Sequence, residues 1–227
     1  MSNFSRDDQL IRRELNNPVP GGESHTYPAA VELFSQGASA GDVYFVHAGI
    51  VKLSRSEANG QEILLDLRFP GSLIGAAAVI SRKSHPAAAL TVTRCTLTRW
   101  SSQQFLSLIA TDISLALRVR EVLSDEVLDH IARISQLTCV SARQRLEHFF
   151  WQLCERFSAA DRAQQSESAA TKFQLPLKHH ELANLLSITP TYLCRLLNAL
   201  EIEELVSRRQ GWIVVPKPGR LWHSGES

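Results

Sequence analysis

The spacing of apolar residues changes near residue 105, and this change constrains the fold more than any other feature of the sequence. Before it, residues 31–70 and the stretch AAALTVTRCTLTRW (residues 87–100) alternate apolar and polar positions between turn-forming residues, which predicts short strands. After it, apolar residues recur every three or four positions up to Leu137, which predicts a helix. The sequence therefore predicts an α+β fold whose strands precede its helices.

The strand region predicts a β-roll or sandwich, since short strands follow one another at close spacing. Residues 43–46 and 50–53 flank a turn, and Asn59-Gly60 is typical of a tight hairpin turn. The segment QEILLDLRF follows that turn, and strict alternation places four of its apolar residues on one face. These are Ile63, Leu65, Leu67 and Phe69.

A single long helix is expected from Phe105 to about Leu137. It could lie on its own domain, or part of its apolar seam could meet the same helix of a second chain in a short parallel coiled coil, which we favour. Charged residues that would flank such a seam are sparse. The residues expected at the dimer seam are Val119, Leu123, Val127, Ile131 and Ile134.

Ser141 is a cap-type residue and predicts the start of a separate helix. The apolar face expected on this helix consists of Leu146, Phe149, Phe150 and Leu153. The polar stretch at 158–172 is expected to be a flexible connection. The predicted domains are a β-roll at 1–110, a dimerisation helix at 111–138 and a C-terminal domain at 139–227, with a hinge near 138–141.

The stretch KHHELANLLSITPTYLCRLLNAL predicts a helix, a tight turn and a second helix. Thr189 can cap the second helix, with Pro190 at the first position, where its missing N–H costs nothing. A helical projection places four leucines on one stripe facing the core: Leu193, Leu196, Leu197 and Leu200. The opposite face carries Thr191, Arg195 and Asn198.

Those three side chains suit base edges in a DNA major groove, where Arg pairs with guanine, Asn with adenine and Thr with bases or phosphate. The next segment, LVSRRQGWIVV, predicts a two-stranded wing. The residues expected at phosphates are Thr189, Tyr192, Arg208 and Arg209. An ordinary helical hairpin is the alternative, but the basic wing favours double-stranded DNA.

The bulk sequence is typical of a cytoplasmic protein. The 227 residues contain no apolar run long enough for a bilayer, and the first residues lack a signal pattern. The four cysteines form no CxxC pair, so we expect reduced thiols in the core or in helices and no metal site. No Walker loop, G-x-S-x-G or H-E-x-x-H motif is present, so no enzyme and no cofactor is predicted.

The C-terminal third resembles the winged helix of the cyclic-AMP receptor protein and fumarate-nitrate regulator (Crp/Fnr) superfamily. The stretch LFSQGASAGDVYFVHAGIVKLSRSEANGQEILLDLRFPGSLIG looks like the cyclic-nucleotide-binding β-roll of the same family. The resemblance covers nearly the whole chain in the family's domain order. It implies a homodimeric bacterial transcription regulator that binds DNA and contacts RNA polymerase; a signalling adaptor that does not bind DNA is the alternative.

Relatives that bind a cyclic nucleotide carry a Glu after a Gly-x-x-x-Gly turn and an Arg-Ser pair about ten residues later. Here Gly71 and Gly75 remain, but Ala76 replaces the Glu, and His85-Pro86-Ala87 lies where the Arg-Ser pair belongs. Losing such charged partners removes about 2–5 kcal/mol of binding. We therefore expect no cyclic nucleotide. The candidate effector pocket consists of Gly71, Ile74, Gly75, Ala76, His85 and Ala87, and its effector is unknown.

Two further expectations follow from departures in this region and in the second helix. Arg82, Lys83 and His85 could hold another anion, although a solvated loop is favoured. Many relatives carry Glu where Thr191 stands, so the resemblance implies a different base preference. Residues 1–50 contain no Cys, which argues against an iron–sulfur sensor.

Overall fold

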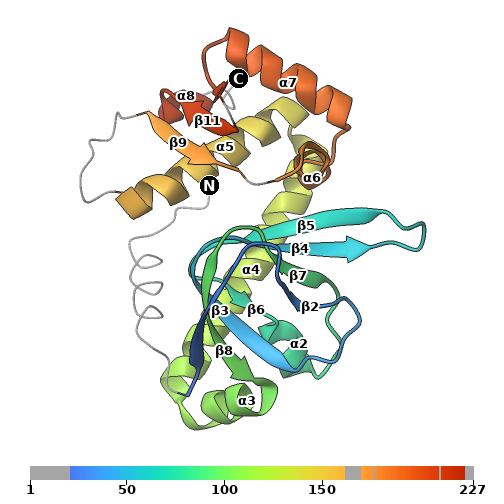
Figure 1. Ribbon diagram of the computed structural model, residues 1–227, viewed down its shortest axis with the longest axis vertical. Helices are drawn as coiled ribbons and strands as arrows, with labels where there is room; N and C mark the ends of the chain where they lie inside the picture. Colours follow the sequence, from blue (N-terminus) through green and yellow to red (C-terminus); the bar gives the residue numbers. More distant parts are fainter. Residues whose placement is uncertain (1–20, 162–169, 176, 210, 223–227) are drawn as a thin grey trace. The chain divides into compact units, whose positions relative to one another are not determined.

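A computed structural model describes residues 21–161, 170–175, 177–209 and 211–222 of the chain (Figure 1). The chain divides into two compact units, Met1–His130 and Ile131–Ser227. The first unit is built mainly of strands and the second mainly of helices, as the change of apolar spacing predicted. The α+β class is therefore confirmed.

The first unit contains two four-stranded sheets in which all strand pairs are antiparallel. One sheet has the order β1 (Glu23–Tyr27), β8 (Cys95–Ser101), β3 (Asp42–Ala48) and β6 (Leu73–Ile74). The other has the order β2 (Glu32–Phe34), β7 (Ala88–Thr91), β4 (Val51–Ser56) and β5 (Glu62–Arg68). This is the predicted β-roll, and β4 and β5 form the predicted hairpin across Asn59-Gly60.

The expected alternation along β5 is wrong at Leu65. The pairing of β4 with β5 shifts register, because Leu53 lies opposite Asp66 while Ser54 lies opposite Leu64. Leu65 is the extra residue of this bulge and is 39% exposed, whereas Leu64 is 3% exposed. A bulge of one residue reverses the face on which the following side chains lie, which a strict period of two cannot anticipate.

The expected single helix is two helices, α3 (Ser102–Thr111) and α4 (Ile113–Cys139). Asp112 separates them with an extended backbone, φ −107° and ψ 100°. Its Oδ1 accepts a hydrogen bond from the Leu115 amide at 3.0 Å, so the carboxylate caps the start of α4. The apolar period runs through this break and therefore concealed it.

Residues 72–80, which follow Gly71 and carry no charge, mostly pack into the core of the roll. Ile74 and Ala76 are 2% and 1% exposed, and helix α2 (Ala76–Ser81) contributes Val79 to the core. Leu115 and Val119 of α4 join the same core cluster. The first turns of α4 thus lie on their own roll, which was the alternative to a dimer seam, and Val119 is a core residue.

Among its described residues, the second unit combines the end of α4 and four further helices with a three-stranded sheet of order β10-β11-β9. Its elements are α5 (Ala142–Asp161), β9 (Thr171–Gln174), α6 (His179–Leu185), α7 (Pro190–Ile202), β10 (Ser207–Arg209), β11 (Trp212–Val215) and α8 (Pro218–Trp222). The predicted cap of α5 is confirmed, since Ser141 Oγ accepts from the Gln144 amide at 3.2 Å. The expected connection at 158–172 is shorter, because α5 and β9 occupy its ends, and residues 162–169 lie outside the described residues.

The cysteines are free thiols in the places expected. Cys95 and Cys154 are buried, in β8 and α5, while Cys139 and Cys194 are exposed on α4 and α7. None of the helices within the described ranges has both the length and the hydropathy needed to span a bilayer.

A buried carboxylate joins the roll to α4. Glu126 lies with its Oε1 2.6 Å from Arg68 Nη1, and Arg68 also contacts Asp66 at 3.3 Å. Burial raises the pKa of Glu126 to about 7, because desolvation outweighs the attraction of Arg68, and Asp66 adds to the rise. The charged form of Glu126 therefore destabilises the folded roll.

Glu126→Gln is expected to stabilise the protein above neutral pH. Since the folded-state pKa exceeds the ordinary value of 4.5, the contribution of Glu126 to wild-type stability is most favourable below that value and is lost as pH rises toward about 7. The loss amounts to about 3 kcal/mol, and the variant should recover about 1–3 kcal/mol of it near pH 8. Urea unfolding at several pH values measures both curves.

Glu121→Gln is the matched control, because its carboxylate on the same helix is 41% exposed. It should leave the dependence of the free energy of unfolding on pH unchanged. A Glu126→Gln variant that unfolds more easily than wild type at every pH would show that the ion pair with Arg68 outweighs the cost of burial.

Candidate nucleic-acid interface

Helices α6 and α7 form the predicted helix-turn-helix. Ala183 on α6 is fully buried, and its carbonyl accepts from the Ile188 amide at 3.0 Å, which closes the turn. Ser187 has a φ of 54°, a left-handed conformation that glycine adopts without strain and that costs about 1 kcal/mol for another residue. Thr189 Oγ1 accepts from the Tyr192 amide at 3.2 Å and caps α7, with Pro190 in its first turn as predicted.

The leucine stripe of α7 is buried and fixes which side of the helix faces outward. Leu193 and Leu200 are fully buried, and Leu196 and Leu197 are 7% and 4% exposed. Thr191, Arg195 and Asn198 lie exposed on the other side. Within the described part of the chain, the Arg195 guanidinium has no hydrogen-bond or ion-pair partner. This side chain is therefore available to a ligand.

Two arginines that the sequence analysis missed fasten the C-terminal end of α6. Arg133 Nη2 donates to the Leu185 carbonyl at 2.9 Å, and Arg145 Nε donates to the Leu186 carbonyl at 3.2 Å. Arg145 Nη1 also donates to the Val140 carbonyl at 2.7 Å. Cations at these carbonyls satisfy the acceptors that a helix end leaves open and suit its negative dipole. Arg133 and Leu185 are 52 residues apart in sequence, and Arg145 and Leu186 are 41 apart, so no local sequence motif indicates these contacts.

Glu203, which directly follows α7, is held by an arginine of α5. Arg143 Nη1 donates to Glu203 Oε1 at 2.6 Å, and its Nε donates to Glu147 Oε1 at 2.8 Å. Glu147 is 1% exposed, so this arginine also neutralises a buried charge. The hydrogen bond from Arg143 lowers the pKa of Glu203. Arg143 thus ties the end of α7 to the start of α5.

Strands β10 and β11 form the predicted wing, residues 207–215. Arg209 is exposed and has no partner in the described ranges, which suits a phosphate contact. Arg208 is engaged instead, since its Nη2 donates to Glu201 Oε2 at 2.6 Å and to Asn198 Oδ1 at 2.7 Å. The hydrogen bond from Arg208 also lowers the pKa of Glu201.

The exposed histidines and cysteine of this surface do not assemble a metal site. Cys194 Sγ lies 3.6 Å from His179 Nε2, and no third ligand joins them from the part of the chain that the structure describes. Among the residues that the structure describes, no three His, Cys, Asp or Glu side chains gather in a way that could hold an ion.

One member of the candidate effector pocket, His85, is buried against another ring of the roll. His85 is 2% exposed and stacks on Phe34, with ring centroids 3.6 Å apart and planes 8° apart. Gly75 has a φ of 84°, and a Cβ there would lie 2.7 Å from the Asp42 carbonyl and 3.3 Å from the His85 ring. Burial lowers the pKa of His85, so the ring is held neutral. The solvated loop expected here is wrong for His85, although Arg82 and Lys83 are exposed.

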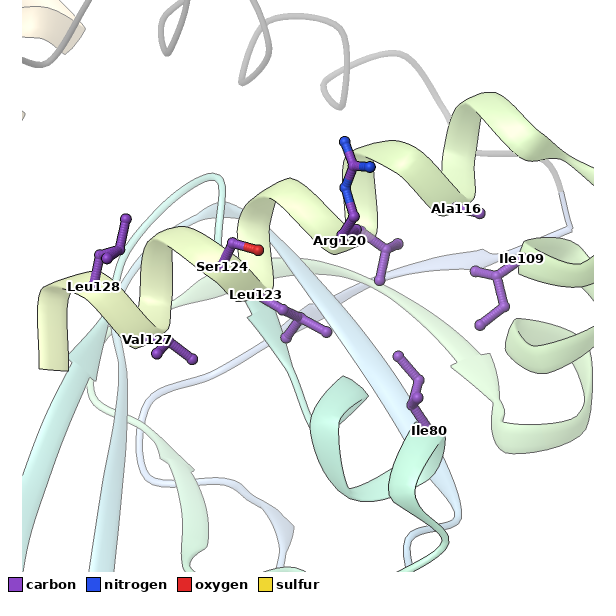
Figure 2. A pocket seen from close by; sticks show the side chains of 9 residues that line it. Ile80, Ile109, Ala116, Arg120, Leu123, Ser124, Val127 and Leu128 are labelled. Atoms are coloured by element: carbon purple, nitrogen blue, oxygen red, sulfur yellow. The ribbon is translucent and has the colours of Figure 1, made fainter. Parts of the chain in front are cut away.

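The roll also carries an apolar groove of about 660 Å³. Figure 2 shows Ile80 of α2, Ile109 of α3, and Leu123 and Val127 of α4 directed toward this common space. Arg120 is the charged side chain among its lining residues. Further along α4, Ile131 and Ile134 are 57% and 65% exposed, and Val127 is 56% exposed. An apolar stripe therefore remains uncovered in the single chain.

Comparison with known families matches both parts of the chain in the predicted order. Residues 24–112 match the model of the cyclic nucleotide-binding domain, and residues 144–223 match that of the Crp-like helix-turn-helix domain. The groove-lining part of α4 lies between the two matched regions.

Curated relatives and solved structures agree with these matches. The chain is 26% identical to the cyclic AMP receptor protein of Thermus thermophilus over 212 residues, covering 93% of this chain and 92% of the relative. It is 23% identical to the fumarate and nitrate reduction regulatory protein of Vibrio cholerae, covering 94% and 79%.

Two solved structures share the fold. The c-di-GMP responsive global regulator CLP of Xanthomonas campestris has a TM-score of 0.66 at 22% identity, with 92% of this chain and 99% of that chain covered. A transcriptional regulator of the CRP family from Thermus thermophilus has a TM-score of 0.72 at 17% identity, with 89% and 97% covered. With its exposed α7 face, the chain is a DNA-binding transcription regulator and belongs to the Crp/Fnr superfamily.

Proposed function

We propose that α7 reads base edges through Thr191, Arg195 and Asn198, while Thr189, Tyr192 and Arg209 contact phosphates. The observation that carries this assignment is Arg195 itself, which is exposed opposite the buried leucine stripe and has no partner among the described residues. A guanidinium offers two parallel donors to guanine O6 and N7. Tyr192 is 45% exposed beside it, and the Thr189 hydroxyl keeps its proton for a phosphate oxygen while its oxygen caps the helix.

The regulator acts as a homodimer through α4. The uncovered stripe on this helix supports a second copy as its occupant, because exposed apolar side chains at helical spacing bury best against an equivalent helix. The seam consists of Leu123, Val127, Ile131 and Ile134, whereas Val119 packs in the core of the roll. Two copies would present two α7 helices to half-sites about 34 Å apart, and a rotation near residues 138–141 would change their spacing.

The roll does not bind a cyclic nucleotide at the family's pocket. Ala76 is 1% exposed and provides no carboxylate for a ribose. The neutral, stacked His85 stands in the region of the missing Arg-Ser pair and provides no charge-assisted donor for a phosphate. The effector is therefore of another class, or the roll only transmits a signal.

The remaining proposals concern the setting in which the regulator works. It acts in the cytoplasm, where its DNA target and RNA polymerase are found, and it carries no enzymatic activity. The free, scattered cysteines support a reducing compartment.

Arg195→Ala is expected to abolish base preference at one position of each half-site. Because a bidentate arginine–guanine contact is worth about 1–3 kcal/mol, binding to the preferred duplex should weaken while binding to other sequences changes little. Competition among duplexes carrying each base pair at each position measures this. Arg209→Ala is the control and should weaken all duplexes alike; an Arg195→Ala protein with its full preference would refute the assignment.

Ile131→Glu is expected to convert the dimer into a monomer. An unpaired charge in an apolar seam should raise the dimer dissociation constant by about 100-fold or more. Sedimentation velocity over a concentration series measures this constant. His130→Glu introduces the same charge at the neighbouring exposed position and should remain dimeric. If wild-type protein sediments as a monomer throughout, α4 is not a dimer seam.

Cyclic AMP is expected to leave the melting temperature unchanged. A ligand that bound with micromolar affinity would stabilise the protein by about 4 kcal/mol at a thousandfold excess over its dissociation constant, which thermal unfolding detects easily. The same titration with cyclic GMP serves as a second case. A dose-dependent rise in the melting temperature would show that the protein binds the nucleotide and would contradict this proposal.

A further inference from the structure

The amide of Asn198 is held from one side by the wing. Asn198 lies on the exposed face of α7, one turn after Arg195, and its Oδ1 accepts from Arg208 Nη2 at 2.7 Å. Glu201, three residues further along the helix, fixes this arginine twice. Its Oε2 accepts from Arg208 Nη2 at 2.6 Å, and its Oε1 accepts from the Arg208 amide at 2.8 Å. Side chain and backbone of Arg208 are thus both anchored to α7.

This arrangement decides which way the amide of Asn198 faces. A guanidinium has donors and no acceptor, so only the oxygen of the amide can be turned toward Arg208. The two hydrogens of Arg208 Nη2 are divided between the Glu201 carboxylate and the Asn198 oxygen. The amide NH2 group of Asn198 consequently points away from the wing, on the face that carries Arg195.

The orientation changes what Asn198 can recognise. An asparagine pairs with adenine by accepting from N6 and donating to N7 at once, which requires a free oxygen beside a free NH2. Because Arg208 turns the oxygen toward the wing, the amide presents its NH2 donor on the face that carries Arg195. Guanine O6 and N7 and thymine O4 are the major-groove acceptors that such a donor suits.

We propose that Arg208 is a positioning residue for base recognition, which holds the Asn198 oxygen and so directs that position toward guanine or thymine and away from adenine. This inference rests on the proposed function, in which Asn198 faces base edges. It also replaces the expectation that Arg208 binds phosphate. Glu201 is part of this positioning role, because its contacts with Arg208 keep the guanidinium from turning to the DNA backbone.

The test compares base preferences of wild type and Arg208→Ala, selected from a pool of random double-stranded DNA at low salt. Asn198→Ala identifies the position that Asn198 reads. At that position, Arg208→Ala should raise binding of adenine relative to guanine and thymine by about fivefold to tenfold, the lower range of one bidentate contact. Arg208→Lys keeps a cationic donor over the amide and should retain the wild-type preference.

Three controls separate this role from a phosphate contact or a folding defect. Arg209→Ala should weaken binding to all sequences alike and reduce the salt dependence by about one phosphate, without changing base preference. In the Asn198→Ala background, Arg208→Ala should cause no further change of preference. Thermal unfolding confirms that each variant is folded. If Arg208→Ala does not fold, the comparison of base preference between wild type and Arg208→Lys still stands.

The inference is overturned if Arg208→Ala acts like Arg209→Ala, with uniform weakening and a smaller salt dependence. It is also overturned if the preference shifts equally in the Asn198→Ala background. If wild type binds DNA but Asn198→Ala changes no base preference, Asn198 does not read a base and this inference fails. The proposed DNA binding itself would stand. Absence of any salt-dependent DNA binding by wild type would instead remove the proposed function.

Discussion

Burial of four leucines along one side of α7 is the constraint on which the DNA-facing surface depends. Each buried leucine contributes about 1.5–3 kcal/mol, so the helix cannot rotate about its axis without a large loss. The polar residues between the leucines are therefore held outward, where Arg195 has no partner among the described side chains. A packing interaction thus creates the binding surface, without any residue of that surface contributing to the core.

Charged contacts then fix the ends of the helix-turn-helix. Arg133 and Arg145 satisfy the last carbonyls of α6, and Arg143 joins the end of α7 to α5. Arg208 extends this fastening to the wing and, in our proposal, to the amide of Asn198. The arginines of this domain therefore differ in role: some hold the scaffold, and those left unpaired are available to the nucleic acid.

We propose that the roll keeps the architecture of its family without the cyclic-nucleotide site. Gly75 retains a left-handed backbone, yet Ala76 and His85 replace the polar groups of cyclic-nucleotide-binding relatives. His85 stacks on Phe34 in the interior of the roll. Glu126 beside Arg68 links the same roll to α4 by a charged contact.

The sequence by itself determined the α+β class, the helix-turn-helix, its Thr189 cap and the outward side of α7, because these follow from periodicity and capping within a few residues. Only the tertiary structure decided the break at Asp112, the bulge at Leu65, the burial of His85 and the partners of Arg143 and Arg208. The break and the bulge leave the apolar period almost intact, so the pattern does not reveal them. The others depend on which residues distant in sequence meet in space, and folding alone brings Glu203 to Arg143 across 60 residues.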